Sequence, residues 1–383
     1  MSRSRLGFFR FVFFFLAFLQ SQLEALDSQL FRQKLKEPTP EWMTEQIEGD
    51  LKPFQKQLSK KSLDEIFVKL KDQMLLFRVR VANNRLVIEA SEEAKKDWRC
   101  RRLVSSLFSL QGVTPLPDID FLVTCHDVFG REEPETSVIQ GNSVTIISMP
   151  IFIIAKPKQY PGMILIPDWY AVNDFHPDKA EILKGNQKYD WNSKIPLLFF
   201  RGADSGVGGD RSNWRKFSRP KLVAYSLEYP ELIDARFNTL LTYEQNSSIR
   251  DQMVKEGMMG KSVPLREFSR YRYLADVDGH TANTPRVALL LHSNSVMMKQ
   301  VTDNMLWFYG ALKPNVHFIP VKQDLSDLVS QIEWAKNHEN ECREIIKNAN
   351  QFASKALSAE AIYLYIYRLL EAYSSKQRKY YKG

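Results

Sequence analysis

The apolar run at residues 195–200 is the feature that most constrains this fold. Its six residues, Ile-Pro-Leu-Leu-Phe-Phe, carry no charge, and they end at Arg201. A strand that is apolar without alternation is typical of the interior of a parallel sheet, where both faces are buried. Parallel strands need long crossover connections, which are usually helices. We therefore expect strands and helices to alternate from residue 195 onward.

The remainder of the second half shows this alternation. Apolar runs predict further strands at residues 221–225, 273–277, 295–299 and 316–321. Helical spacing predicts helices at 285–292, 326–337, 342–357 and 359–373, with Asp324 as the N-cap of the second. Repeated strand–helix units of this kind predict a doubly wound α/β domain. The last helix is long enough to cross back to the first half of the chain.

The first half predicts a smaller α/β unit. Residues 26–75 look helical, 76–80 and 85–89 form a hairpin, and 121–124, 144–148 and 152–155 form short strands. Residues 177–195 are polar with little periodicity, so we expect an interdomain linker there. The length of 383 residues also favours two domains. The predicted division is residues 26–190, residues 191–357, and a returning helix at 358–383.

The N-terminus predicts targeting. Three arginines precede the apolar run at residues 11–19, which is too short for a full membrane span. Residues 1–25 therefore fit a signal peptide or signal anchor, the alternative being an amphipathic or buried first helix. Such a segment predicts a location in the secretory pathway lumen or a bacterial envelope. As a signal anchor it would also attach the protein to the membrane. Three cysteines leave room for one disulfide at most.

The charge of the chain favours anionic partners. Its net charge is +8 and its pI is about 9.1. Lysines and arginines are spread along the whole chain rather than clustered among stacking aromatics. This distribution argues against nucleic-acid binding and leaves nucleotides, phosphorylated lipids or a membrane surface as candidate partners.

Three segments carry residues suited to chemistry. The strand at 121–124 is followed by His126 and Asp127, and a carboxylate at a strand end can accept a proton from an attacking hydroxyl. Asp127 as the cap of a turn is the structural alternative. After the strand at 195–200 comes a glycine loop, bounded by Arg201 and Arg211, that is suited to anions. The alternative there is a plain surface loop. The glycines of this loop are Gly202, Gly206, Gly208 and Gly209.

The third segment follows the strand at 273–277. Asp278 and Gly279 lead into a small polar loop, and Pro285 suits the first position of the next helix. Free N–H groups at that helix start, with Arg286 beside them, would favour a diphosphate. An ordinary strand–turn–helix link is the alternative.

Two acidic pairs raise the possibility of a metal. Asp118-x-Asp120 and Asp276-x-Asp278 each place two carboxylates on one face of a strand, which could hold Mg²⁺ or Mn²⁺ with a diphosphate. Such pairs also occur often by chance. A metal-dependent reading therefore stays open as an alternative.

Six motifs in order resemble the Rumi-type protein O-glucosyltransferases and the related fungal capsule-associated and bacterial lipopolysaccharide-modifying enzymes. They span roughly residues 110–370 and are listed here by position: Pro117-Asp-Ile-Asp-Phe121 with His126-Asp127; Ile166-Pro-Asp-Trp169; Phe200-Arg-Gly202 with Arg211; Tyr273-Leu274 with Asp278-Gly279 and Arg286; Ser293-Asn-Ser-Val296 with Lys299; and residues 312–321 with 324–328.

The resemblance implies a GT-B-type α/β fold with two Rossmann-like domains facing a cleft. It implies inverting transfer from a UDP-sugar, as co-substrate, without a metal or other cofactor. Asp127 takes the place of the general base. The donor site then comprises Arg201, Gly202, Ser205, Arg211, Asp278, Gly279, Thr281, Ala282, Asn283, Thr284 and Arg286. The acceptor side comprises Pro167, Asp168 and Trp169.

The sequence departs from the family at several positions. Ala203 stands where the family usually has Ser or Thr, so Ser205 is the candidate replacement. The glycine loop is lengthened, and Thr284-Pro285 replaces an expected small–aromatic pair. We therefore expect a glycosyltransferase that moves a sugar, such as glucose or xylose, to a hydroxyl of a protein or glycan. A catalytically silent nucleotide-binding relative is the other alternative.

Overall fold

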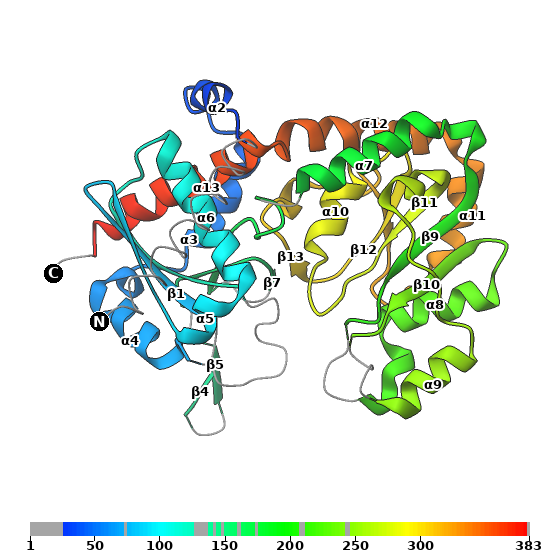
Figure 1. Cartoon of the computed structure of the whole chain (residues 1–383), viewed down its shortest axis with the longest axis horizontal. Helices are drawn as coiled ribbons and strands as arrows, with labels where there is room; N and C mark the ends of the chain where they lie inside the picture. Colours follow the sequence, from blue (N-terminus) through cyan, green and yellow to red (C-terminus); the bar gives the residue numbers. More distant parts are fainter. Residues whose placement is uncertain are drawn as a thin grey trace, which may run out of the picture.

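The computed structural model describes residues 26–72, 75–125, 137–140, 143–146, 149–158, 162–172, 175–206, 211–241 and 246–380. Figure 1 shows two lobes side by side, each with its own sheet. The predicted signal segment at 1–25 lies outside the described residues. Within the described part, no helix is long and apolar enough to cross a membrane.

The first lobe is built on a mixed five-stranded sheet in the order β2-β1-β3-β6-β8. β1 pairs antiparallel with β2 and β3, whereas β3, β6 and β8 run parallel. The hairpin predicted across Asn83 and Asn84 is confirmed, because both residues adopt the positive φ that a tight turn requires. The strands are β1 (Leu76–Ala82), β2 (Arg85–Ala90), β3 (Ile119–Thr124), β6 (Ile151–Ile153) and β8 (Met163–Leu165).

Helices and smaller strands surround this sheet. The helices are α2 (Ser28–Lys34), α3 (Glu41–Leu51), η1 (Lys56–Leu58), α4 (Lys60–Leu70), α5 (Glu92–Lys96) and α6 (Trp98–Val113). Two small pairings complete the lobe: β4 (Ser137–Gln140) with β5 (Ser143–Ile146), and β7 (Lys156–Pro157) with β13 (Asn304–Met305) of the second lobe. The strand expected at 144–148 thus corresponds to β5, and residues 147 and 148 lie outside the described part.

The second lobe has a wholly parallel sheet in the order β10-β9-β11-β12-β14. This confirms the parallel sheet predicted from residues 195–200, and β9 lies inside it. The strands are β9 (Ile195–Ala203), β10 (Ile233–Thr239), β11 (Tyr271–Asp276), β12 (Val296–Gln300) and β14 (Ile319–Val321). Its helices are η3 (Trp191–Ser193), η4 (Arg211–Lys216), α8 (Ser218–Glu228), α9 (Ser247–Lys255), η5 (Leu265–Arg270), α10 (Thr284–Leu290), η6 (Tyr309–Ala311), α11 (Leu328–Asn337) and α12 (Glu339–Ala356).

The strand predicted at 221–225 is wrong, because these residues belong to helix α8. Leu222, Val223 and Ser226 share its buried face, a spacing that fits a helix. A short apolar run does not by itself distinguish a buried helix from a buried strand. The strand that pairs with β9 is β10, in which buried and partly exposed residues alternate.

The linker expected at 177–195 is mostly helix α7 (Phe175–Lys188). Only Phe175, Ile182 and Gly185 are buried in it, so its apolar stripe is too narrow to be recognised in a polar stretch. α7 lies along the second lobe, where Asn186 donates to the carbonyl of His292 at 2.8 Å. It precedes the domain boundary placed at residues 190 and 191, which stays a prediction.

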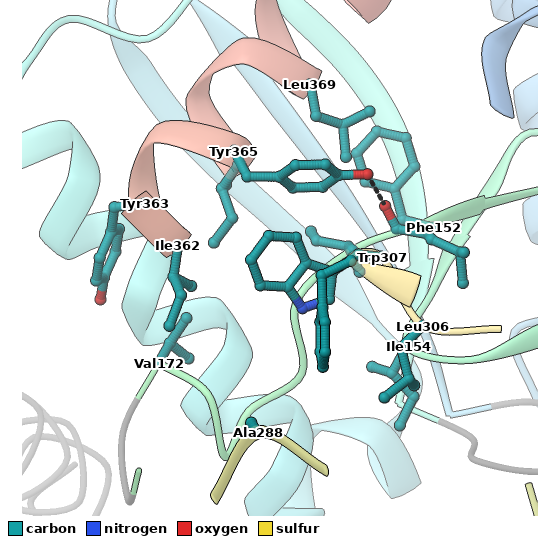
Figure 2. Close-up of a cluster of buried hydrophobic side chains, with 14 of the residues drawn as sticks. Phe152, Ile154, Val172, Ala288, Leu306, Trp307, Ile362, Tyr363, Tyr365 and Leu369 are labelled. Atoms are coloured by element: carbon teal, nitrogen blue, oxygen red, sulfur yellow. Dashed lines mark hydrogen bonds between the residues drawn. The ribbon is translucent and has the colours of Figure 1, made fainter. Parts of the chain in front are cut away.

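The C-terminal helix α13 (Ala359–Gln377) returns to the first lobe, as predicted (Figure 1). The Gln377 side chain donates to the carbonyl of Asp120 at 2.7 Å and accepts from its N–H at 2.9 Å. Figure 2 shows Tyr365 of α13 packed against Trp307 of the second lobe, with ring centroids 4.7 Å apart. One continuous hydrophobic core therefore joins the two lobes.

Two smaller expectations concern a helix cap and the cysteines. The N-cap of α11 is Asp327 rather than Asp324, whose carboxylate instead accepts from the N–H of Ser326 in the preceding turn. Cys100, Cys125 and Cys342 are buried free thiols, so no disulfide joins them. Together, the two sheets, their crossover helices and the returning helix confirm the predicted GT-B-type α/β fold class.

Candidate functional site

A pocket of about 180 Å³ lies between the lobes at the carboxyl ends of β9 and β11. From β9 the chain passes to β10 on one side of the sheet and then returns to β11 on the other side of β9. The strand order therefore reverses between β9 and β11. Such a switch point is where open α/β sheets bind ligands. Among the described residues the lining comprises Ile154 and Trp169 of the first lobe, and Ser205, Arg219, Gly279, His280, Thr281, Ala282, Asn283, Thr284 and Pro285 of the second.

Two loops meet closely at the base of this pocket. Gly206 adopts φ +117°, and a Cβ there would lie 3.0 Å from the carbonyl oxygen of Gly279. A Cβ on Gly279 would lie 2.8 Å from the Ser205 hydroxyl. Glycine is therefore required at both positions, one for its backbone conformation and the other for the close approach of the loops.

Arg219, which the sequence reasoning missed, forms the floor of the pocket. It is the second residue of α8 and is 6% exposed. Its Nη1 donates to the Ser205 hydroxyl at 2.5 Å and the carbonyl of Ala203 at 3.0 Å, and its Nε donates to the carbonyl of Val277 at 3.2 Å. These partners are neutral oxygens, so the positive charge remains available to a ligand.

The electrostatic setting of Arg219 reflects its burial. Loss of water lowers the pKa of its guanidinium to about 10, and neighbouring Arg286 acts in the same direction. Three buried carboxylates behind the pocket oppose this shift. Arg219 stays charged at neutral pH, and an anion entering the pocket would relieve the repulsion between the two arginines.

Arg286 and Asn283 hold the polar loop against Arg219. When the Asn283 amide oxygen faces the arginines, it accepts from Arg286 Nε at 3.0 Å and from Arg219 Nη2 at 3.2 Å. Arg286 Nη2 also donates to the carbonyl of Arg201 at 2.7 Å, and its guanidinium lies 4.6 Å from the ring centroid of Phe200. Burial lowers the pKa of Arg286 as well. Two guanidinium groups thus converge where a diphosphate was predicted.

The helix start beside this loop differs in detail from the prediction. α10 begins at Thr284 with Pro285 in its first turn, and Asn283 is its N-cap residue without a side-chain capping bond. The oxygen of Asn283 faces the two arginines instead. Thr281, Ala282, Asn283 and Thr284 all line the pocket, so the structure brings this predicted segment together with Ser205 and Gly279.

Arg201 and Gly202 are placed differently. Arg201 forms an ion pair with Asp234 at 2.7 Å and donates to the carbonyl of Phe200 at 2.8 Å. Its guanidinium therefore ties β9 to β10, and neither Arg201 nor Gly202 is in the pocket lining of the described residues. Their contribution there is the Arg201 carbonyl, which accepts from Arg286.

The acidic pairs are engaged by protein groups. Asp120 accepts two hydrogen bonds from Arg78, at 2.7 and 2.6 Å, whereas Asp118 is exposed and accepts from the N–H of Asn83. Asp276 pairs with Lys299 at 3.2 Å. Asp278 accepts from Thr302 at 2.5 Å and Asn304 at 2.7 Å. Among the described residues, no group of three or more His, Cys, Asp or Glu side chains is placed to hold a metal.

Asp278 is not in the pocket lining of the described residues, and it supports the loop at 279–283 through contacts outside the pocket. It is 7% exposed, and burial raises the pKa of its carboxyl, with Lys299 opposing. Its N–H donates to the side-chain oxygen of Gln300 at 3.1 Å. These bonds fix the end of β11 from which the loop at 279–283 departs.

The wall of the pocket contributed by the first lobe follows β8. Pro167 and Asp168 are buried, and Trp169 lines the pocket. Asp168 accepts from the N–H of Ala171 at 2.6 Å and bonds the Thr284 side chain across the cleft. Burial raises the pKa of this carboxyl. Asp168 thus joins the two walls, and Trp169 beside it lines the pocket.

The side chains of two predicted site residues lie outside the described part of the chain. Asp127, the predicted base, lies outside the described residues, as does His126. The backbone of Arg211 opens η4, but its side chain is outside the described part. The signal that would have found Arg219 is its position at the start of the helix after the glycine loop, where helix N–H groups and an arginine both favour an anion.

Comparisons with known proteins agree with the motifs. The profile for glycosyl transferase family 90 matches residues 36–382. The chain is 28% identical over 340 residues to protein O-glucosyltransferase 2 of Danio rerio, which covers 87% of this chain and 62% of that protein. It is 27% identical over 342 residues to protein O-glucosyltransferase 1 of Mus musculus, which covers 86% and 78%.

Other similarities are partial. Protein O-glucosyltransferase 3 of Mus musculus is 31% identical over 195 residues, covering 51% of this chain and 35% of that protein. The chain thus spans less than two thirds of the first relatives it matches. The solved structure of Anabaena HepE with UDP-glucose has a TM-score of 0.34 at 14% identity, covering 51% of this chain and 53% of that one.

Sucrose-phosphate synthase from Thermosynechococcus elongatus has a TM-score of 0.36 at 14% identity, covering 74% of this chain and 64% of that one. At these TM-scores the two structures add nothing to the argument. The family match extends over nearly the whole described chain, and it confirms the resemblance that the ordered motifs indicated. The chain belongs to glycosyl transferase family 90.

Proposed function

We propose that this protein transfers a sugar, glucose or xylose, from a UDP-sugar to a hydroxyl of a protein or glycan acceptor, with inversion. The observation that carries the proposal is the convergence of Arg219 and Arg286 beneath a pocket between two lobes. Family membership and the names of the relatives, which are protein O-glucosyltransferases, support it.

The donor would lie with its diphosphate over Arg219. The guanidinium is held by four neutral oxygens, those of Ala203, Ser205, Val277 and Asn283. They leave one of its five N–H groups, on Nη2, to donate to a phosphate oxygen without rearrangement. The Ser205 hydroxyl, which contacts Arg219, replaces the hydroxyl lost at Ala203. Backbone N–H groups of the loop at 280–283 would add neutral donors, whereas that of Gly279 already donates to the carbonyl of Thr281. Arg211 remains a further donor-site prediction.

The reaction balances on this arrangement. The acceptor oxygen attacks the anomeric carbon and forms the new glycosidic bond, while the bond from that carbon to the β-phosphate oxygen breaks. The acceptor proton passes to Asp127, the proposed base. UDP leaves with the bonding electron pair, and Arg219 and Arg286 stabilise its growing charge. The UDP-sugar is a co-substrate, and we propose no cofactor.

A metal-dependent mechanism is the second candidate, because one observation favours it. Oδ1 of Asp276 and Oδ1 of Asp278 are buried without a hydrogen-bond partner among the described residues. Carboxylate oxygens are ligands for Mg²⁺ and Mn²⁺. If EDTA abolishes sugar transfer and Mn²⁺ restores it, the metal-dependent alternative holds. Activity that is insensitive to EDTA supports the arginine mechanism.

The decisive experiment is a panel of UDP-sugars scored by UDP release, together with calorimetry of UDP binding. We expect UDP to bind and one UDP-hexose or UDP-pentose to turn over. Binding of UDP without turnover of any donor, in the presence of acceptor extracts, would identify a catalytically silent relative. Absence of UDP binding would refute the proposal.

We also propose a secretory-lumen or bacterial-envelope location, through the segment at 1–25.

A further inference from the structure

Trp98 is set apart from the other tryptophans of this protein. The chain has seven, all within the described residues, and only Trp98 is exposed, with 49% of its surface open. It is the first residue of α6, directly after the N-cap Asp97. A tryptophan ring is among the most costly side chains to leave in water, so its position calls for a physical account.

Trp98 is continuous with the transfer pocket through Trp169. The two ring centroids are 6.1 Å apart and the rings are nearly perpendicular, at 81°. Trp169 and Arg219 both line the pocket. A single exposed apolar residue is ordinary, but two adjoining indoles that lead from a substrate pocket to solvent form a surface. We call Trp98 and Trp169 the tryptophan shelf.

The surroundings of the shelf are polar and basic. Arg102 lies over the Trp98 ring, 5.0 Å from its centroid, and Arg99 lies over the Trp169 ring, 5.5 Å from its centroid, so a guanidinium covers one face of each ring. Lys95, Lys96 and Arg101, on the same segment, are exposed. An interface with a folded protein would bury about 800 Å² per partner around an apolar centre, and two rings that each have one face under a guanidinium offer much less.

The shelf suits a sugar ring better. A pyranose has one face of C–H groups that packs on an aromatic face, and hydroxyls at its edge that hydrogen-bond with surrounding cations and water. We propose that the tryptophan shelf binds an oligosaccharide acceptor, with Trp169 nearest the site of transfer and Trp98 contacting a sugar further from it. This inference rests on the proposed function and names the class of acceptor.

The test compares Trp98→Ala with the parent and with Val254→Ala. Val254 is 58% exposed on α9 of the second lobe, so its variant controls for loss of an exposed apolar side chain. Acceptors are tetrasaccharides of glucose, xylose and mannose, and unglycosylated serine peptides, each with the active UDP-sugar. We expect a tetrasaccharide to be used, and its KM to rise about tenfold in Trp98→Ala only.

Further readings separate the shelf from the donor site. UDP affinity and the slow hydrolysis of the UDP-sugar in water should be unchanged in Trp98→Ala, and Trp98→Phe should recover most of the acceptor KM. If peptides but no tetrasaccharide are used, or if Trp98→Ala keeps the parent KM, the shelf proposal fails. If the parent itself neither binds UDP nor hydrolyses a UDP-sugar, the proposed function fails instead.

Discussion

The two walls of the cleft are built in different ways. On the second lobe, two arginines at the pocket are fixed by protein partners: Arg219 by four oxygens, and Arg286 by the Arg201 carbonyl and the Asn283 amide that it shares with Arg219. On the first lobe, Trp169 and Trp98 present aromatic surface. A rigid cationic wall suits a constant group such as the proposed nucleotide diphosphate, whereas an aromatic wall suits the proposed acceptor.

The largest expected effect tests whether the first lobe acts on the acceptor and the second lobe binds the donor. Asp127→Asn removes the proposed base, which acts on the acceptor, so transfer should fall by a factor of about 100 or more. UDP affinity, which depends on the other wall, should stay the same by calorimetry. Transfer at the parent rate would show that another group accepts the proton.

The next effect concerns the donor wall alone. Arg219→Ala should weaken UDP binding by about 2–3 kcal/mol, the loss typical of charge-assisted hydrogen bonds, and Arg219→Lys should recover part of it. The matched control is Arg201→Ala, because Arg201 pairs with Asp234 outside the pocket lining. We expect that control to lower thermal stability more than UDP affinity. The reverse ranking would support the sequence-based assignment of Arg201 to the donor site.

Arg286 should have a smaller effect than Arg219, because it lies outside the pocket lining of the described residues and acts partly through Asn283. Arg286→Ala should weaken UDP binding by roughly 1–2 kcal/mol. The double variant with Arg219→Ala should lose less than the sum, because the two side chains share the Asn283 oxygen. Strict additivity in calorimetry would mean that they act independently.

The smallest effect concerns the support behind the donor wall. His292 is 5% exposed and lies 5.6 Å from the ring of Phe175 in α7. Burial, then Lys179 and His176, lowers its pKa from an ordinary 6.5 to about 3. Below pH 6.5 this histidine is therefore protonated in the unfolded chain but stays neutral in the folded chain. The free energy of unfolding falls as the pH falls through this range.

When the pH is lowered from 6.5 to 5.5, His292 alone should reduce the free energy of unfolding by about 1 kcal/mol. His292→Leu should remove that part of the pH dependence, as measured by denaturant unfolding at the two pH values. Asn186 of α7 donates to the His292 carbonyl, but Asn186→Asp is unsuitable as a control because it adds a second titrating group. Phe175→Leu keeps His292 and should keep the slope. An unchanged slope in His292→Leu would assign the acid sensitivity to other groups.

Much of the second lobe was predictable, for a local reason. The uninterrupted apolar run at 195–200 has few ways to be buried other than as an inner parallel strand, and β9 lies there. The motif at 278–286 was also predictable, since a strand end, a glycine and an N-terminal proline act over neighbouring residues. The run at 221–225 was not, because its few apolar residues fit a helix and a strand equally well.

The sequence by itself determined the family, the alternation of strands and helices, and the loops at 202–206 and 278–284, since these depend on neighbouring residues. Only the tertiary structure decided which arginine lines the pocket. Arg201 meets Asp234, 33 residues away, and is committed to that ion pair, whereas Arg219 meets only neutral oxygens and keeps its charge for the pocket. The direction of a side chain depends on partners distant in sequence, and no local pattern records them.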